Sequence, residues 1–178
     1  MLPSLIGVIA SSDGGVANSY ESIATVTVGG GGSSTISFSS IPSTYQHLQI
    51  RATYNFPSAA NLRMQLNGAT NNTNLHYLTG DGSSAGAGRD TAGNIISLQY
   101  GSGTSFYVQI MDVLDYADTN KNKTIRHLGG VDYNGSGGIY LASSLYSTTS
   151  AISSISITSN NGTNFSQYSS FALYGIKG

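Results

Sequence analysis

The residues of this chain whose types could support chemistry are few, and their densest group lies in residues 112–132. Seven of the fifteen charged side chains fall there. The run DTNKN at 118–122 places oxygen-bearing side chains on alternate residues, as the start of a calcium-binding loop does. However, Lys123 stands where that loop requires glycine, and Gly129 stands where it requires a bidentate glutamate. We therefore interpret residues 112–122 as an Asx-rich turn with surface ion pairs, with cation binding as the alternative.

Three histidines, His47, His76 and His127, are the remaining candidates for metal binding or proton transfer. They fall on different expected segments, whereas a zinc site needs three or four converging ligands. The absence of cysteine excludes thiolate nucleophiles and thiolate metal ligands. We therefore expect no metal site, and we interpret each histidine as a surface or hydrogen-bonded side chain.

The spacing G-x-S-x-G occurs once, at residues 82–86, but a nucleophile elbow also needs a helix after the turn. No helix is expected there, because the surrounding residues 80–90 (GDGSSAGAGRD) indicate a long flexible loop. The same missing helix argues against a phosphate-binding glycine loop. Glu21 is the only glutamate, and no pair of aspartates stands out as a glycosidase acid pair. We predict that the chain is not an enzyme and has no catalytic residues and no cofactor.

The elements that would position these residues are short strands. Strict alternation in HLQIRATY places Leu48, Ile50, Ala52 and Tyr54 on one face, which is typical of a half-buried strand. Residues 61–66 repeat the pattern before the turn dipeptide at Asn67. The expected strands are residues 19–28, 35–38, 47–54, 61–66, 94–100, 105–114, 124–128, 138–142, 151–158 and 170–176.

About ten strands separated by Gly, Asn and Ser turns, with no amphipathic helix between them, predict an all-β fold. The favoured form is a two-sheet antiparallel β-sandwich that is jelly-roll-like, because such a fold accommodates about eight strands and long loops. With 178 residues, the chain fits one domain. We place that domain at residues 19–178, after an N-terminal arm at residues 1–18.

The arm carries an apolar run in MLPSLIGVIA that is too short to cross a membrane. It has no basic residue ahead of it, so it lacks the charged front of a secretory signal. We predict that it anchors the protein on another surface, and a disordered end is the alternative. The candidate anchoring residues are Leu2, Leu5, Ile6, Val8 and Ile9.

The surface expected from the composition is polar but nearly uncharged. Only 8% of residues are charged and the net charge is −1. A near-zero charge favours association, and the lack of a basic surplus argues against nucleic acid as a partner. Among the twelve tyrosines, those in expected loops are candidate partner contacts, and caps on the sheets are the alternative. These candidates are Tyr116, Tyr133 and Tyr168.

Three stretches together resemble a family of small β-rich virion structural proteins of tailed bacteriophages. They are residues 20–51, residues 112–128 with DYADTNKNKTIRHL, and residues 151–178. The closing FALYGIKG, at 171–178, is the most specific part. The resemblance covers most of the chain from Tyr20 onward. It implies a structural role in the virion, with no catalytic residues to carry over.

The leading hypothesis is therefore a capsid decoration (cement) protein that binds and stabilises the capsid shell. We expect a homo-oligomer, in particular a trimer from common virion symmetry, bound to the major capsid protein or another virion protein. The expected location is the capsid surface, or alternatively the tail, after assembly in the host cytoplasm, with no membrane partner. A tail-fibre or receptor-binding domain that contacts host glycan or protein is the alternative function. A polysaccharide-degrading enzyme is the third, disfavoured by the lack of an acid pair.

Overall fold

The structure is a computed structural model that describes residues 19–91, 95–97 and 105–178, so the expected N-terminal arm lies outside the described residues. The described residues form twelve β-strands. The strands are β1 (Tyr20–Thr27), β2 (Thr35–Phe38), β3 (His47–Tyr54), β4 (Leu62–Leu66), β5 (Thr73–Gly80), β6 (Ala85–Asp90), β7 (Ile95–Ser97), β8 (Tyr107–Leu114), β9 (Lys123–Asp132), β10 (Gly137–Tyr146), β11 (Ile155–Ser159) and β12 (Ser170–Ile176).

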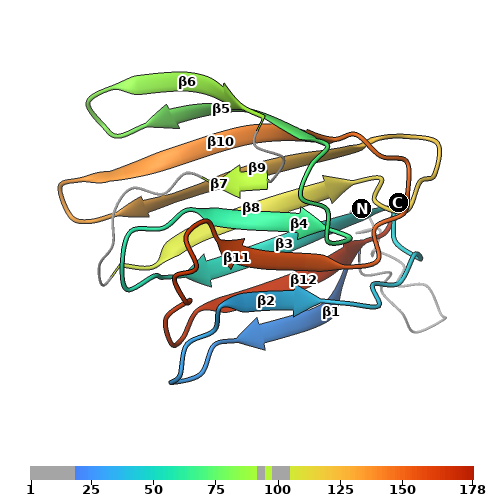
Figure 1. Ribbon diagram of the computed structural model, residues 1–178, viewed down its shortest axis with the longest axis horizontal. Helices are drawn as coiled ribbons and strands as arrows, with labels where there is room; N and C mark the ends of the chain where they lie inside the picture. The colour runs from blue at the N-terminus through green and yellow to red at the C-terminus, as the bar shows by residue number, and fades with distance from the viewer. Residues whose placement is uncertain (1–18, 92–94, 98–104) are drawn as a thin grey trace, which may run out of the picture.

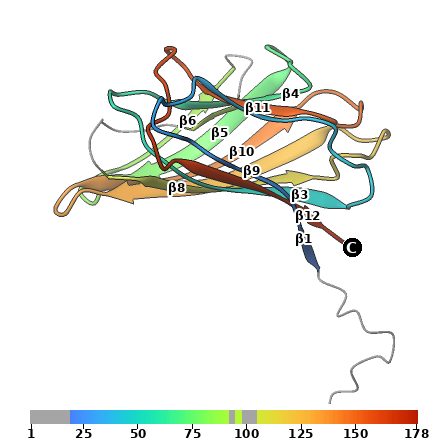
Figure 2. The ribbon, with the colours of Figure 1, turned by 90° about the horizontal axis from the view of Figure 1, so that it is seen from below.

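These strands form two stacked antiparallel sheets, which confirms the predicted all-β sandwich (Figures 1 and 2). The large sheet has eight strands in the order β1-β12-β3-β8-β9-β10-β5-β6. The small sheet has four strands in the order β2-β11-β4-β7. Within the described residues, no helix is long and apolar enough to cross a membrane.

The strand pairing is that of a jelly roll with two added hairpins. When β5–β6 and β9–β10 are set aside, the first strand pairs with the last and the others pair inward in order: β1 with β12, β2 with β11, β3 with β8, and β4 with β7. Such nested antiparallel pairs, divided between two sheets, are the arrangement of a jelly roll. The two added hairpins extend the large sheet from its β8 side (Figure 1).

The core lies between the sheets, where the alternating apolar positions meet. Leu48, Ile50 and Tyr54 of β3 are almost completely buried, as the sequence pattern predicts. An aromatic cluster closes one part of this core. Its ring centroids are 4.7 Å apart for Phe56 and Phe165, and 5.0 Å apart for Phe165 and Phe171.

Turn chemistry sets the strand ends. Asn67 and Gly68 both have positive φ, at 51° and 70°, which matches the predicted asparagine–glycine turn after β4. Asp81 organises the turn between β5 and β6, because its Oδ1 accepts hydrogen bonds from the backbone N–H groups of Ser83 and Ser84 at 2.9 and 2.7 Å. These bonds stabilise the carboxylate and hold its pKa well below the usual range.

The prediction of a long flexible loop at residues 80–90 is wrong. Residues 85–90 form β6, which pairs with β5, a strand that the sequence analysis did not identify. The glycines hid this hairpin, because glycine lowers the apparent strand tendency of a segment. The structure also extends the strands predicted at 124–128 and 138–142 into β9 and β10, and it begins β11 at Ile155 rather than at residue 151. The expected strand at 94–100 lies outside the described residues except for β7.

Candidate interaction surface

The outer face of the large sheet, which points away from the small sheet, carries exposed apolar side chains. On β8, Tyr107 and Met111 point into the core, whereas Val108 and Ile110 point outward and are 58% and 43% exposed. Leu128 on β9 and Leu141 on β10 are also exposed. A strand with apolar residues on both faces is typical of a strand that is covered on both sides.

Four of these side chains form a continuous line, which we call the apolar row: Ile110, Leu128, Leu141 and Leu78. Ile110 pairs with Leu128, Leu128 with Leu141, and Leu141 with Leu78. Directly opposite residues in a sheet point to the same face and touch. The row therefore presents neighbouring apolar side chains from β8, β9, β10 and β5. Contiguous exposed apolar surface of this kind marks a binding site in folded proteins.

A second line runs beside the apolar row, two residues away from it on each strand. This polar row contains Gln49, Asp112, Arg126, Ser143 and His76, which are paired across β3, β8, β9, β10 and β5. Gln49 Nε2 donates a hydrogen bond to Asp112 Oδ1 at 2.8 Å, and Arg126 Nη2 donates to Asp112 Oδ2 at 3.1 Å. The carboxylate is thus fixed by two neighbours and is only 15% exposed, while Arg126 remains 62% exposed.

Arg51 connects the two rows on β3. Its Nε donates a hydrogen bond to Gln49 Oε1 at 2.8 Å. Its guanidinium carbon lies 5.5 Å from the ring centre of Tyr20 and 5.4 Å from that of Tyr174, which is a cation–π arrangement. The ring contacts and the amide hold the guanidinium in place, so this part of the outer face is ordered before any partner binds.

Two shallow hollows flank Leu128 and Leu141 on this face. One, of about 420 Å³, is lined by residues that include Leu78, Leu141 and Arg126. The other, of about 360 Å³, is lined by residues that include Ile110, Leu128 and Arg51. Each hollow therefore has apolar walls and an arginine at its edge. Such relief suits the insertion of side chains from an opposing surface.

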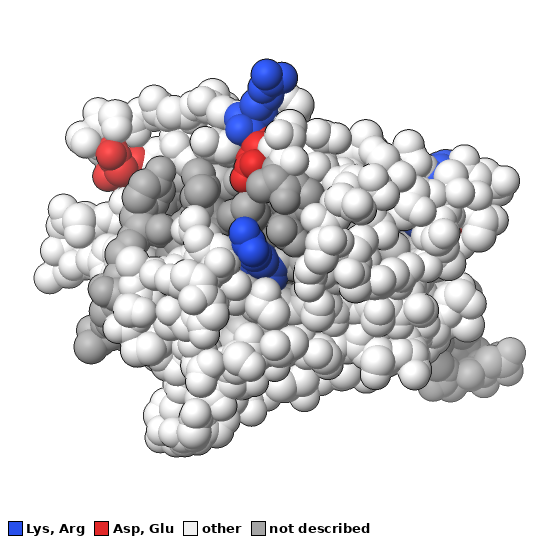
Figure 3. Space-filling view, viewed as in Figure 1, with Lys and Arg blue, Asp and Glu red and all other residues white. Residues whose placement is uncertain are grey.

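The opposite side of the molecule has a different character. The small sheet turns Ser37, Ser156 and Thr158 outward, and these side chains are hydroxyls rather than hydrocarbons. Figure 3 shows this side with few Lys, Arg, Asp or Glu side chains. The sandwich therefore has one outer face that carries the apolar row beside a polar row, and one outer face that is polar with few charges.

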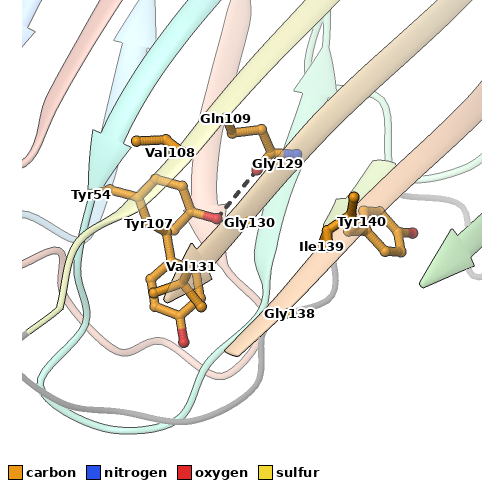
Figure 4. Close-up of a pocket in the computed structure, with 10 residues that line it drawn as sticks. All are labelled: Tyr54, Tyr107, Val108, Gln109, Gly129, Gly130, Val131, Gly138, Ile139 and Tyr140. Carbon is orange, nitrogen blue, oxygen red and sulfur yellow. Dashed lines mark hydrogen bonds between the residues drawn. The ribbon is translucent and has the colours of Figure 1, made fainter. Parts of the chain in front are cut away.

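A buried polar chain lies beneath the outer face, beside two glycines of β9 (Figure 4). Tyr54 Oη donates a hydrogen bond to Gln109 Oε1 at 3.2 Å, and the Gln109 amide nitrogen lies 3.1 Å from His127 Nδ1. Since that nitrogen can only donate, His127 Nδ1 is the acceptor and its proton sits on Nε2. Burial lowers the pKa of His127 to about 4. The adjoining cavity, at Gly129 and Gly130, is only about 10 Å³, which is space for about one water molecule at most.

The three tyrosines proposed as partner contacts have different environments. The prediction for Tyr116 is wrong, because its side chain is fully buried and its hydroxyl donates a hydrogen bond to the backbone oxygen of Pro42. Tyr133 is half-buried and its hydroxyl is hydrogen-bonded to that of Tyr107. Tyr168 is 71% exposed and has a φ of +71°. Tyr168 alone of the three presents its side chain freely to a partner.

The acidic segment 112–122 adopts the Asx-rich turn with ion pairs that the sequence analysis favoured. Lys121 Nζ lies 2.9 Å from Asp115 and 3.4 Å from Asp118. The Lys123 side chain is fully buried, and its Nζ donates hydrogen bonds to the backbone oxygens of Asp118, Lys121 and Thr149. The ammonium thus takes the carbonyl oxygens that a bound cation would use.

The histidines are dispersed, as predicted. His47 Nδ1 accepts a hydrogen bond from the backbone N–H of Asp115 at 2.9 Å, His76 lies on β5 in the polar row, and His127 is buried. Across residues 19–91, 95–97 and 105–178, no three His, Asp or Glu side chains converge on a point where a metal ion could bind. The predicted anchoring residues Leu2, Leu5, Ile6, Val8 and Ile9 lie outside the described residues.

The sequence analysis missed the apolar row. The signal was present in YVQIMDVL, where Val108 and Ile110 are apolar although they alternate with inward-facing residues. Apolar residues on both faces of a strand indicate that both faces are covered. The remaining members are Leu128 and Leu141, in strands that were predicted too short, and Leu78, in β5, which was not predicted.

Comparisons of the chain with protein-family models, curated proteins and solved structures found no match.

Proposed function

We propose that this chain is a structural protein of a bacteriophage particle, specifically a capsid decoration protein that binds and stabilises the shell. The observation that carries the proposal is the exposed apolar row on the outer face of the large sheet, which no other part of the described chain covers. Ile110, Leu128, Leu141 and Leu78 are between 42% and 57% exposed, which costs free energy in an isolated protein. A protein that functions by association recovers that free energy when the face is covered.

Two further observations support this assignment. The jelly-roll pairing is frequent among viral capsid domains, although the fold by itself does not determine a function. The resemblance of residues 20–51, 112–128 and 151–178 to small virion proteins of tailed phages points to the same setting. In this proposal the outer face holds a neighbouring copy, while the N-terminal arm anchors the protein to the major capsid protein or another virion protein.

Quantitative mass spectrometry of purified virions tests the proposal. A decoration protein is present in many copies on each particle, in a fixed ratio to the shell protein. Particles that lack it release their genome at a lower temperature than complete particles. They are also less resistant to low salt, so they release the genome sooner when the ionic strength is lowered. Absence of the chain from virions would contradict the proposal. Equal heat resistance of complete and depleted particles would also contradict it.

Tyr168 favours a second candidate, a tail-fibre or receptor-binding domain. A tyrosine with positive φ is uncommon, and here the strained residue places an aromatic side chain in solvent. Exposed tyrosine is well suited to contact with sugars or proteins. A fibre domain is present in few copies per particle, and the free protein blocks adsorption of phage to host cells. The Tyr168→Ala variant loses this blocking if the second candidate is correct.

A further inference from the structure

We propose that the outer face of the large sheet binds a second copy of this chain, giving a two-fold dimer in which the apolar rows face each other. The inference rests on the proposed function, because it names the partner at the same surface. It can fail separately, because the purified chain suffices to test it.

The size of the face fits a stable dimer. Neighbouring strands lie about 4.8 Å apart and each residue adds about 3.4 Å, so eight strands of about eight residues cover about 900 Å². A standard protein–protein interface uses about 800 Å² on each partner. Two copies of this face thus supply the area that a specific dimer requires.

A contact between two copies of one face has two-fold symmetry, because the same patch is used by both partners. A ring of three subunits needs two different complementary patches. Within the described residues, the two broad faces differ: the outer face of the large sheet carries the apolar row, whereas that of the small sheet carries hydroxyls, an amide and Arg63. The inference therefore replaces the expected trimer with a dimer at this surface.

The polar row selects the direction of the two-fold axis. When the axis runs along the strands between β8 and β9, every residue of β8 lies opposite its cross-strand partner in the second copy. Asp112 then faces Arg126 of the second copy, and Arg126 faces the second Asp112. Ile110 likewise faces Leu128 of the second copy. At these positions opposite charges and apolar side chains are both matched, and such matching sets the register of an interface. Further from the axis, β10 lies over β3 of the second copy, so Leu141 packs on the side chain of Arg51 there.

An axis at right angles to this one, running along the apolar row, gives a poorer fit. It places the polar row of one copy over the line on the other side of the apolar row, which contains Val108, Gly130 and Ile139. Asp112 and Arg126 would then be buried against apolar groups, with each other but no charge of the second copy as partners. Burial of charges that gain no partner from the second copy is costly, so the axis along the strands is favoured.

The first test compares one substitution on each broad face. Sedimentation equilibrium of the full-length chain, at micromolar to millimolar concentration, is expected to give a dimer. Leu128→Arg, in the middle of the apolar row, is expected to give a monomer, because an arginine replaces the side chain that packs against Ile110 of the second copy. Ser37→Arg, on the outer face of the small sheet, is the matched control and remains dimeric. Far-UV circular dichroism verifies that both variants fold.

The second test uses the opposed charges. Asp112→Arg alone places two arginines opposite each other in the dimer, and Arg126→Asp alone places two aspartates opposite each other, so each variant weakens its own dimer. A mixture of the two restores both attractive pairs between chains. The dissociation constant of the mixed dimer is therefore expected to be at least about tenfold lower than that of either variant alone.

Three results would overturn the inference. They are a wild-type chain that stays monomeric at high concentration, a dimer that survives Leu128→Arg, and a mixture that associates no better than its components. Each leaves the proposed function open to the virion experiment, since a monomer can still decorate a shell through another surface. Conversely, a dimer formed by a chain that is absent from virions supports this inference and contradicts the proposed function.

Discussion

Two buried polar side chains, Lys123 and His127, differ in how far their hydrogen-bonding groups are paired. Lys123 satisfies its ammonium with three backbone oxygens. His127 accepts one hydrogen bond at Nδ1, while its Nε2 has no hydrogen-bond partner among the residues that the structure describes. A buried cation is tolerated when its donors are paired, whereas a buried imidazole without such partners stays neutral. The two residues therefore respond differently to substitution and to pH.

Acidification is expected to destabilise the protein through His127. Its pKa is about 4 in the folded chain, compared with 6.5 for a histidine exposed to solvent in the unfolded chain. Between these values the unfolded chain binds the extra proton, so the stability that is fully present above pH 6.5 is lost as the pH falls towards 4. The loss at pH 4.5 is expected to be about 2–3 kcal/mol. Urea unfolding at pH 7 and pH 4.5 measures it.

His127→Met is the control for this prediction, because methionine has a side chain of similar size that does not titrate. Its stability is expected to change less between pH 7 and pH 4.5 than that of the wild type. Equal pH dependence in the two proteins would mean that His127 is not the group responsible.

Lys123→Met is expected to destabilise the protein by about 2–4 kcal/mol, because it leaves three backbone oxygens without their donor. The exposed Lys121→Met is the matched control. Its ion pairs with Asp115 and Asp118 lie at the surface, so the urea midpoint is expected to change little. A large effect for Lys121 and a small one for Lys123 would contradict the role assigned to the buried ammonium.

At the scale of elements, the glycines of β9 allow the added hairpins to join the jelly roll around a buried polar chain. Gly129 pairs with Gln109 on β8, whose side chain reaches both Tyr54 and His127. A Cβ atom at Gly129 would lie 2.9 Å from the Val108 backbone oxygen and 3.2 Å from Gln109 Cγ. The glycine thus provides the space that Gln109 occupies.

Gly129→Ala is expected to destabilise the protein by about 1–3 kcal/mol, because the backbone of β8 must shift to accept the methyl group. Gly29→Ala is the control, since a Cβ atom there meets nothing within 4 Å. Thermal or urea unfolding measures both variants. Equal stability of the two variants would show that the close approach at Gly129 is relieved without cost.

At the scale of the whole molecule, the sandwich is two-sided. One broad face bears the apolar row, and the other bears hydroxyls and amides with few charges (Figure 3). Its low charge weakens the repulsion between copies, so in the proposed dimer apolar burial dominates the association. That dimer covers only the face that bears the apolar row.

The melting temperature of the wild type is expected to rise with protein concentration, because a partner that binds only the folded chain stabilises it. The Leu128→Arg variant is expected to melt at a temperature that does not depend on concentration. Differential scanning calorimetry over a hundredfold range of about 1–100 μM measures both. Parallel behaviour of the two proteins would argue against association through the outer face.

The sequence by itself determined the fold class and the positions of several strands. Alternation in β3 and β4 and the turn at Asn67 each depend on neighbours along the chain, and the structure has them as predicted. The burial of Tyr116 and the β5–β6 hairpin depend on contacts that local sequence patterns do not show, so both were predicted wrongly. The apolar row exists only because register aligns Ile110, Leu128 and Leu141 across three strands. Strand pairing, which joins such distant positions, was decided by the tertiary structure.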